Sequence, residues 1–410
     1  MFDKQIVEFN ENILSLRDFV DLLQPILKER LDKHDSKVQP IVASIMVQQL
    51  MQKYKDAPDE EKQELNEIKE KVDKIVESTY SEKLDIKFDE LETEDERLIL
   101  KNLQVISNTK IDIKEHFKNA KRSSTHIDLL FKNSLISLLS SVEWFFAQIL
   151  HYYYDKYPDS AGINDKSLKL SQIKAFDSLK EAEKHLIENR IEEILRGSFD
   201  SWLELLGNKP INLGLGYLKE RKEEIIEIYQ RRNIIIHNGG VVNSIYNLKV
   251  DKDLRKDKQV GDTLKLDKNY LDNSICKLHL VFVLIASELW KKLDPEDKKR
   301  GEILNDIVYE NILSDRWEIA EGLSYFVLKD SKMDVTDKLV SQINFWLCRK
   351  RRGNYEEIRK EVEKVDFSDK KEIYQIVLYA LREESDKFFE LLPVVLESKQ
   401  LNIDRLEEFP

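Results

Sequence analysis

The residues best suited to chemistry lie close together in the segment YQRRNIIIHNGGVVNSIY, residues 229–246. A guanidinium, an amide and an imidazole follow one another there, at Arg232, Asn233 and His237. Histidine can exchange a proton near neutral pH, and arginine keeps its charge and can hold an anion through two parallel hydrogen bonds. The segment could therefore transfer a proton beside a bound anion, if the fold brings these side chains together.

The apolar spacing of this segment predicts a helix in which Arg232 has an unusual place. Positions at steps of four, three and four are occupied by Ile225, Tyr229, Arg232 and Ile236. Arg232 therefore lies on or beside the apolar stripe, directly after a second arginine, Arg231. A guanidinium in such a position is costly unless it has a partner.

The predicted helix ends just after His237. Asn238 and the glycine pair that follows it tolerate positive φ, which is typical of a helix C-terminus. Asn233 and His237 are four residues apart and should share one face of the last turns. Unpaired carbonyl groups at that end favour the protonated form of His237.

Glu143 is the predicted partner of Arg232. It lies in LLSSVEWFFAQIL (138–150), flanked at helical spacing by Leu139, Phe146 and Leu150. A carboxylate in such a row lies at a boundary or is buried with a partner. We expect an ion pair with Arg232, and such a pair could also be a purely structural contact between two helices.

The pattern Arg232-Asn233-x-x-x-His237 resembles the Arg-(polar)-x3-His motif of the HEPN superfamily, the "higher eukaryotes and prokaryotes nucleotide-binding" domains. The helix with Glu143, the segment around Trp202, the glycine-terminated motif and a closing apolar helix also follow one another in an order typical of HEPN chains. The resemblance covers residues 119–293. It implies a compact all-helical bundle, usually dimeric, that is often a metal-independent endoribonuclease.

Carried over to this chain, the resemblance implies that Arg232 and His237 form the catalytic pair and that Asn233 holds the polar position between them. Glu143, Arg231 and Asn238 would be supporting residues. RNA contains its own nucleophile, the 2′-OH, so histidine would move protons while arginine neutralises the charge that develops on phosphorus. No cofactor and no metal are expected, and the cleft would form between two motifs across a homodimer.

Composition predicts an all-α fold. The 410 residues are 41% apolar and 35% charged, with only 11 glycines and 8 prolines. The net charge of −12 argues against a surface coated for phosphate binding, so RNA contact would be confined to a narrow cleft. The N-terminal MFDKQIVEFNEN shows no signal-peptide pattern, and the longest apolar run, LHLVFVLIA (278–286), is too short to span a bilayer. A cytoplasmic protein without membrane contact is expected.

Three regions are predicted, an N-terminal helical region (1–118), the HEPN-like domain (119–293) and a C-terminal helical region (294–410) that could stack helical hairpins. Alternating residues within 247–267 suggest a small β-hairpin or a loop. The basic cluster RKRR (349–352) has two interpretations: cations in a last helical turn before the glycine cap Gly353, or a patch that contacts phosphates.

Three functions remain open at this point. The first is an RNA-cleaving toxin or antiviral abortive-infection effector, with a protein partner or antitoxin held by the flanking helical regions. The second is a HEPN-type protein that binds a nucleotide or RNA without cleaving it, and the third is a scaffold. No other histidine in the sequence has an arginine-led, glycine-terminated setting, so a single chain supplies one such set. Acid–base cleavage needs two proton-transferring groups, which is the reason to expect a homodimer.

Overall fold

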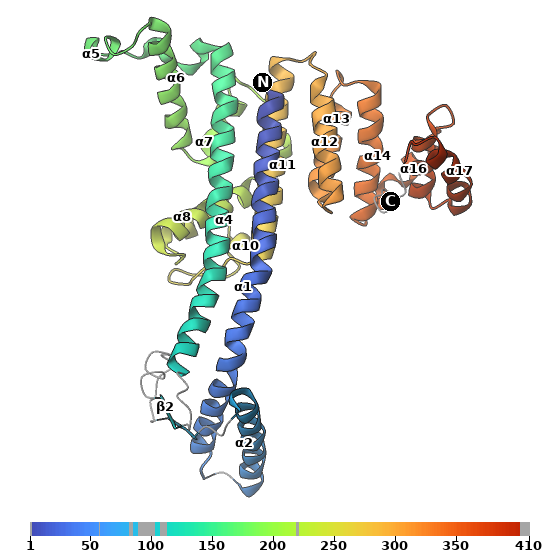
Figure 1. Cartoon of the computed structure of the whole chain (residues 1–410). Coiled ribbons are helices and arrows are strands. Elements are labelled where there is room, and N and C mark those ends of the chain that lie inside the picture. The colour runs from blue at the N-terminus through green and yellow to red at the C-terminus, as the bar shows by residue number, and fades with distance from the viewer. Residues whose placement is uncertain are drawn as a thin grey trace. The chain divides into compact units, whose positions relative to one another are not determined.

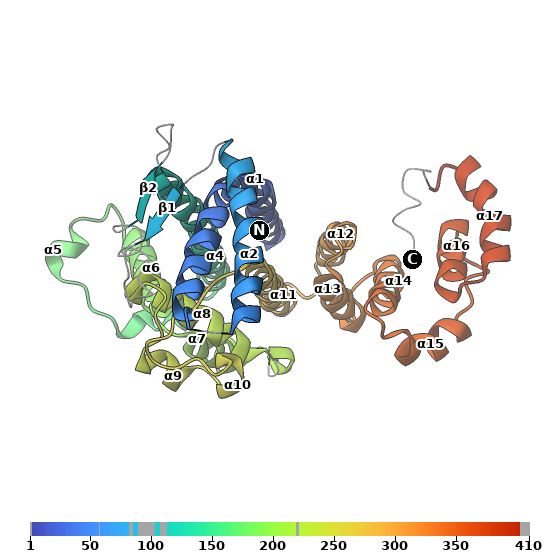
Figure 2. The ribbon, with the colours of Figure 1, turned by 90° about the horizontal axis from the view of Figure 1, so that it is seen from below.

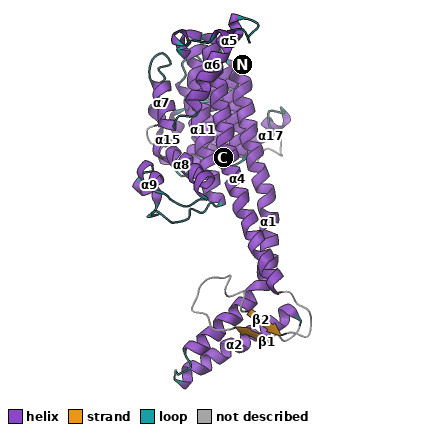
Figure 3. Cartoon of the chain, turned by 90° about the vertical axis from the view of Figure 1, so that its left-hand side faces the viewer, coloured by secondary structure: helices purple, strands orange, loops and turns teal. Residues whose placement is uncertain are grey.

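In the residues that the structure describes, the fold is all-α apart from one short two-stranded ribbon, which confirms the predicted fold class (Figures 1 and 3). The computed structural model describes residues 2–56, 58–81, 85–88, 103–106, 113–218 and 221–401. The ribbon pairs β1 (Asp85–Phe88) with β2 (Leu103–Ile106) in antiparallel register, with Asp85 opposite Ile106.

The chain divides into two compact units, residues 18–133 and residues 1–17 together with 134–410. This division differs from the three ranges expected from the sequence. Two long helices, α1 (Phe2–Lys53) and α4 (Ile113–Lys156), each contribute to both units. A boundary at residue 118 would therefore fall inside α4, and the C-terminal region does not separate as a unit of its own.

The unit of residues 18–133 contains the later part of α1, the helix α2 (Asp59–Tyr80) and the first part of α4. In α2 only Val76 is buried, and the first turn is acidic. This agrees with the solvated helix that its charged sequence predicts. Buried apolar residues of α1 in this unit include Val38, Ile41 and Ile45.

The other unit contains a helical bundle that holds the predicted site. Its principal helices are the later part of α4, the start of α1, α6 (Leu179–Leu195), α7 (Phe199–Gly207), α8 (Lys222–Asn238) and α11 (Lys268–Leu293). Shorter elements connect them: η1 (Pro158–Ala161), η2 (Ile163–Asp165), α5 (Leu170–Ile173), η3 (Gly216–Leu218), α9 (Ser244–Lys249) and α10 (Lys252–Arg255).

Aromatic side chains join these helices into one core. Phe146 of α4 stacks on Trp202 of α7 with ring centroids 4.4 Å apart, and Tyr229 of α8 lies 5.8 Å from the same indole. Phe9 of α1 stacks on Phe145 of α4 at 4.2 Å. The first turns of α1 therefore complete the bundle, beside α4 and α11 (Figure 1).

The helix α11 lies in the middle of this bundle. It is the one helix in the described ranges that is long and apolar enough to cross a membrane, yet 78% of its most apolar window is buried inside the fold. Residues 278–286 are all buried, as is typical of a helix in the core of a bundle.

The C-terminal part of this unit continues as successive helices (Figure 2). They are α12 (Lys299–Leu313), α13 (Trp317–Lys329), α14 (Val335–Arg351), α15 (Tyr355–Lys364), α16 (Glu372–Arg382) and α17 (Ser385–Glu397). A fully buried ion pair joins α12 to the end of α13, because Arg300 Nη2 lies 2.7 Å from Asp330 Oδ2. The guanidinium of Arg300 donates further hydrogen bonds and the carboxylate of Asp330 accepts them. A buried ion pair requires such additional hydrogen bonds.

The RKRR cluster is used within the fold. Arg349 Nε lies 2.7 Å from Glu321 of α13, and Arg352 Nη1 lies 2.5 Å from the same carboxylate. Lys350 donates to carbonyl groups at the end of α16. Gly353 follows with φ +79°, the left-handed conformation of a helix cap. These contacts favour the helix-end interpretation over the phosphate patch.

The predicted hairpin within 247–267 is wrong. Residues 244–249 form the helix α9, because the Asn243 side chain accepts a hydrogen bond from Tyr246 N at 2.9 Å and caps the helix. The only β-type pairing of this segment in the described chain is a single antiparallel bridge between Val241 and Thr263. A local cap therefore overrides the alternating pattern of Asn247–Val250.

Candidate functional site

The helix α8 carries all the motif residues and ends as predicted. His237 lies in its last turn, and Gly239 caps it with φ +61°. Gly240, with φ +87°, returns its N–H to the Ile234 carbonyl at 2.9 Å. Left-handed backbone at both positions requires residues that tolerate positive φ, which explains the glycine pair after the motif.

The predicted ion pair between Arg232 and Glu143 is present. Arg232 Nη2 donates to Glu143 Oε1, and this joins α8 to α4. Arg232 Nη1 donates to Asn233 Oδ1 at 3.3 Å. The Arg232 and Glu143 side chains are 20% and 30% exposed, so the pair lies at the boundary of the core. Three predicted site residues are thus brought together.

Two electrostatic effects oppose each other at Glu143. Burial raises the pKa of its carboxyl group above the ordinary value, and the charge and hydrogen bond of Arg232 offset only part of that rise. Tyr229, one turn before Arg232, is buried, and its hydroxyl has no hydrogen-bond partner among the described residues. Its ring centroid lies 5.9 Å from the Arg232 guanidinium carbon. Burial, with the nearby Glu143 charge, raises the pKa of Tyr229. Sequence reasoning treated Tyr229 only as part of an apolar stripe and missed this polar contact.

His237 is exposed and stands apart from that cluster within one chain. Five residues separate it from Arg232, a rotation of about 140° around a helix, so the two side chains project in different directions. No hydrogen bond or ion pair between His237 and Arg232, Asn233 or Glu143 occurs in the described residues. Asn238 has a local role, because its Nδ2 donates to the Val241 carbonyl at 2.5 Å and holds the turn that follows.

Arg231 belongs to a different network on another face of α8. Its Nε lies 2.7 Å from Glu227 Oε1, and both side chains are nearly buried. Glu227 also accepts hydrogen bonds from the hydroxyls of Tyr246 at 2.8 Å and Tyr270 at 2.6 Å. Arg231 stacks over the Tyr270 ring at 3.9 Å. These contacts make Arg231 a structural residue that fastens α8 to α9 and α11. An isolated Glu227 between apolar neighbours was the sequence signal for this network.

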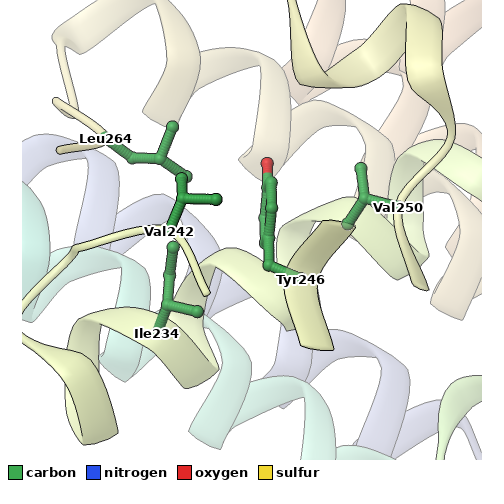
Figure 4. Close-up of a cluster of buried hydrophobic side chains, with 5 residues drawn as sticks. All are labelled: Ile234, Val242, Tyr246, Val250 and Leu264. Atoms are coloured by element: carbon green, nitrogen blue, oxygen red, sulfur yellow. The ribbon is translucent and has the colours of Figure 1, made fainter. Parts of the chain in front are cut away.

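A small apolar cluster holds the segment after His237 against α8 (Figure 4). It consists of Ile234, Val242, Tyr246, Val250 and Leu264. Backbone hydrogen bonds support it, from Val242 N to Asp262 O at 2.8 Å and from Leu264 N to Gly240 O at 2.9 Å. The end of α8 is therefore fixed from both sides, so the position of His237 is set by packed structure.

In the described parts of the chain, no three His, Cys, Asp or Glu side chains gather as metal ligands would. Comparison with known proteins adds no relative: no family model matches the chain, and neither a curated protein nor a solved structure is similar to it.

Proposed function

We propose that this protein is a HEPN-type endoribonuclease that cleaves RNA by attack of the 2′-OH, at a composite site built by two copies of the chain. The observation that carries the proposal is the geometry of α8. In α8, Arg232 forms an ion pair with Glu143 and a hydrogen bond with Asn233. His237 is exposed in the last turn of the same helix, which the glycine pair ends.

The chemistry requires one proton acceptor and one proton donor. Neutral His237 of one copy takes the proton from the 2′-OH while the 2′-oxygen forms a bond to phosphorus. The bond from phosphorus to the 5′-oxygen breaks, and protonated His237 of the second copy gives its proton to that leaving oxygen. Arg232 and the Asn233 amide stabilise the negative charge on the phosphorus-bound oxygens. The products are a 2′,3′-cyclic phosphate and a 5′-hydroxyl.

A second copy of the chain also explains how one site can form although Arg232 and His237 are separated within one helix. An isologous interface brings the same patch from each chain together, so the two His237 side chains can face each other across one cleft. The apolar side chains of Tyr229 and Val142 cannot supply the dimer contact, because both residues are buried in the chain's own core. Exposed apolar side chains lie instead next to His237 and in α9: Ile236, Ile245 and Leu248, which are 45%, 56% and 86% exposed. We place the dimer contact there.

The biological role that fits such an activity is a cytoplasmic toxin or antiviral abortive-infection effector, with the flanking helical regions free to bind a protein partner or antitoxin. Overexpression should arrest growth, and the His237→Ala protein should not. The alternative is a HEPN-type protein that binds a nucleotide or RNA, or acts as a scaffold, without cleavage. The observation in its favour is the Arg232–Glu143 pair, which on its own fastens two helices.

RNA cleavage in vitro tests the proposal. His237→Ala should reduce the rate by about 10²–10⁴-fold, the usual contribution of a proton-transferring side chain. His126→Ala is the matched control, since His126 is also an exposed histidine on a helix, and it should cleave at the wild-type rate. Equal rates for wild type and His237→Ala would show that the site is assigned to the wrong residues.

A further inference from the structure

A pocket lies beside the face of α8 that carries Arg231. It is a pocket of about 830 Å³ between α8, α11 and the segment that includes residues 254–265. Sites for small molecules usually have volumes of roughly 300–1,000 Å³. The Glu227–Arg231–Tyr270 network lines this pocket, so a built and nearly buried polar surface already exists there.

The charges that line the pocket do not balance. Arg231 is neutralised by Glu227, and Lys277 by Glu224 at 2.6 Å. The remaining lining cations are Arg255, Lys256, Lys258 and Lys265, none of which has an ion-pair partner in the described residues.

One carboxylate remains against these four cations. Asp267 caps α11 by accepting a hydrogen bond from Tyr270 N at 2.8 Å. Four cations against one carboxylate leave an excess of three positive charges in the pocket. The chain as a whole carries a net charge of −12, so this concentration of unpaired cations runs against the average of the surface. Such an excess is suited to a ligand with several negative charges.

The position of Arg255 points to an acceptor in the pocket. Its Nε is buried, and it has no hydrogen-bond partner in the described part of the chain. A buried N–H without an acceptor is costly, and most such groups in native proteins are paired. An anionic oxygen bound in the pocket would complete the hydrogen bonding of this guanidinium.

We propose that this pocket binds a compact ligand with two or more adjacent phosphate groups, held by Arg255, Lys258 and Lys265. The ligand is compact because the pocket has a volume of about 830 Å³. Leu264, next to Lys265, bonds through its N–H to the carbonyl of Gly240. A bound ligand would therefore also stabilise the turn after His237.

Calorimetric titration of the full chain with inorganic tripolyphosphate tests this site. We expect one binding event per chain, weaker binding of inorganic phosphate, and a higher melting temperature in the presence of tripolyphosphate. The Lys258→Gln, Lys265→Gln double variant should bind at least about tenfold more weakly, since it loses charge-assisted hydrogen bonds.

The matched control is the Lys249→Gln, Lys252→Gln double variant, which removes the same charge from exposed positions of the same segment outside the pocket. It should weaken binding by less than about twofold, because separated surface charges are largely screened. Equal losses in the two double variants, or no binding by wild type, would overturn the proposal.

Two further arms distinguish a small polyphosphate ligand from bound RNA. Single-stranded RNA should not compete with tripolyphosphate for the pocket. If RNA bound the pocket and tripolyphosphate did not, the ligand would be an RNA backbone instead of a small polyphosphate. The His237→Ala protein should bind tripolyphosphate as wild type does. Ligand binding in the pocket and the proposed RNA cleavage are therefore tested independently of each other.

Discussion

The contact between Glu143 and Arg232 holds the proposed phosphate-binding side chain in place. Glu143→Ala removes the carboxylate that accepts from Arg232 Nη2 and leaves a guanidinium that is only 20% exposed. Glu143→Gln keeps the size and a hydrogen-bond acceptor but removes the charge. The alanine variant should therefore lose more stability and more cleavage activity than the glutamine variant.

The magnitude follows from the partial burial of the pair. Breaking a fully buried ion pair costs about 3–5 kcal/mol, and an exposed pair contributes about 0–1 kcal/mol. Side chains that are 20% and 30% exposed lie between these limits. We expect Glu143→Ala to lower the free energy of unfolding by about 2 kcal/mol. A double-mutant cycle with Arg232→Ala should give a coupling energy of about 1–2 kcal/mol.

Urea unfolding followed by circular dichroism measures these values. The matched control is Glu193→Ala, which breaks an ion pair with Arg190 whose side chains are 37% and 49% exposed, and it should remain close to wild type. Equal stability of Glu143→Ala and Glu193→Ala, together with no coupling in the cycle, would contradict this prediction. Glu143 would then not position Arg232.

Three other predictions concern chemistry and pH. The RNA product should carry a 2′,3′-cyclic phosphate, and cleavage should persist in excess EDTA; activity that is lost with EDTA and restored by magnesium would require another mechanism. Burial lowers the pKa of His279 to about 3, and neither ring nitrogen has a hydrogen-bond partner in the described chain. In the unfolded chain the His279 imidazole takes up a proton near its ordinary pKa of about 6.5, whereas in the folded chain it does not. The stability is therefore highest well above that pKa, and it should fall by about 2 kcal/mol from about pH 7 to about pH 5. His279→Leu should flatten that slope in urea unfolding at each pH, and an unchanged slope would assign it to other groups. Tyr246→Phe leaves Glu227 with one hydrogen bond fewer and should cost about 1–3 kcal/mol in the same assay; no loss would show that the network around Arg231 does not stabilise the end of α8.

Features that depend on neighbouring residues were predictable from the sequence. The end of α8 follows from Asn238 and two glycines, and the partner of Arg232 follows from a carboxylate in an apolar row. Each of these inferences uses helical spacing and the cost of an unpaired buried charge. Both act within one or two helices, so the rest of the fold was not needed.

Features that depend on distant packing were not predictable. Phe9 belongs to the core because it stacks on Phe145, and no periodic pattern in α1 indicates which of its turns meet α4. Glu227 meets Tyr246 and Tyr270 through three separate elements. The alternating residues after Tyr246 suggested a strand, but the cap at Asn243 stabilises a helix. Local patterns are ambiguous where tertiary contacts or a single cap decide the outcome.

Cleavage by mixtures of wild-type and His237→Ala chains tests the composite site most directly. Equal amounts of the two chains are unfolded, mixed and then refolded together. Some of the dimers should then be heterodimers that lack one of the two proton-transferring groups. If both His237 side chains serve one cleft, activity falls as the square of the wild-type fraction, to about a quarter of the wild-type rate at equal amounts. Activity of about half, falling linearly with the wild-type fraction, would mean that each chain acts alone and would contradict the composite site.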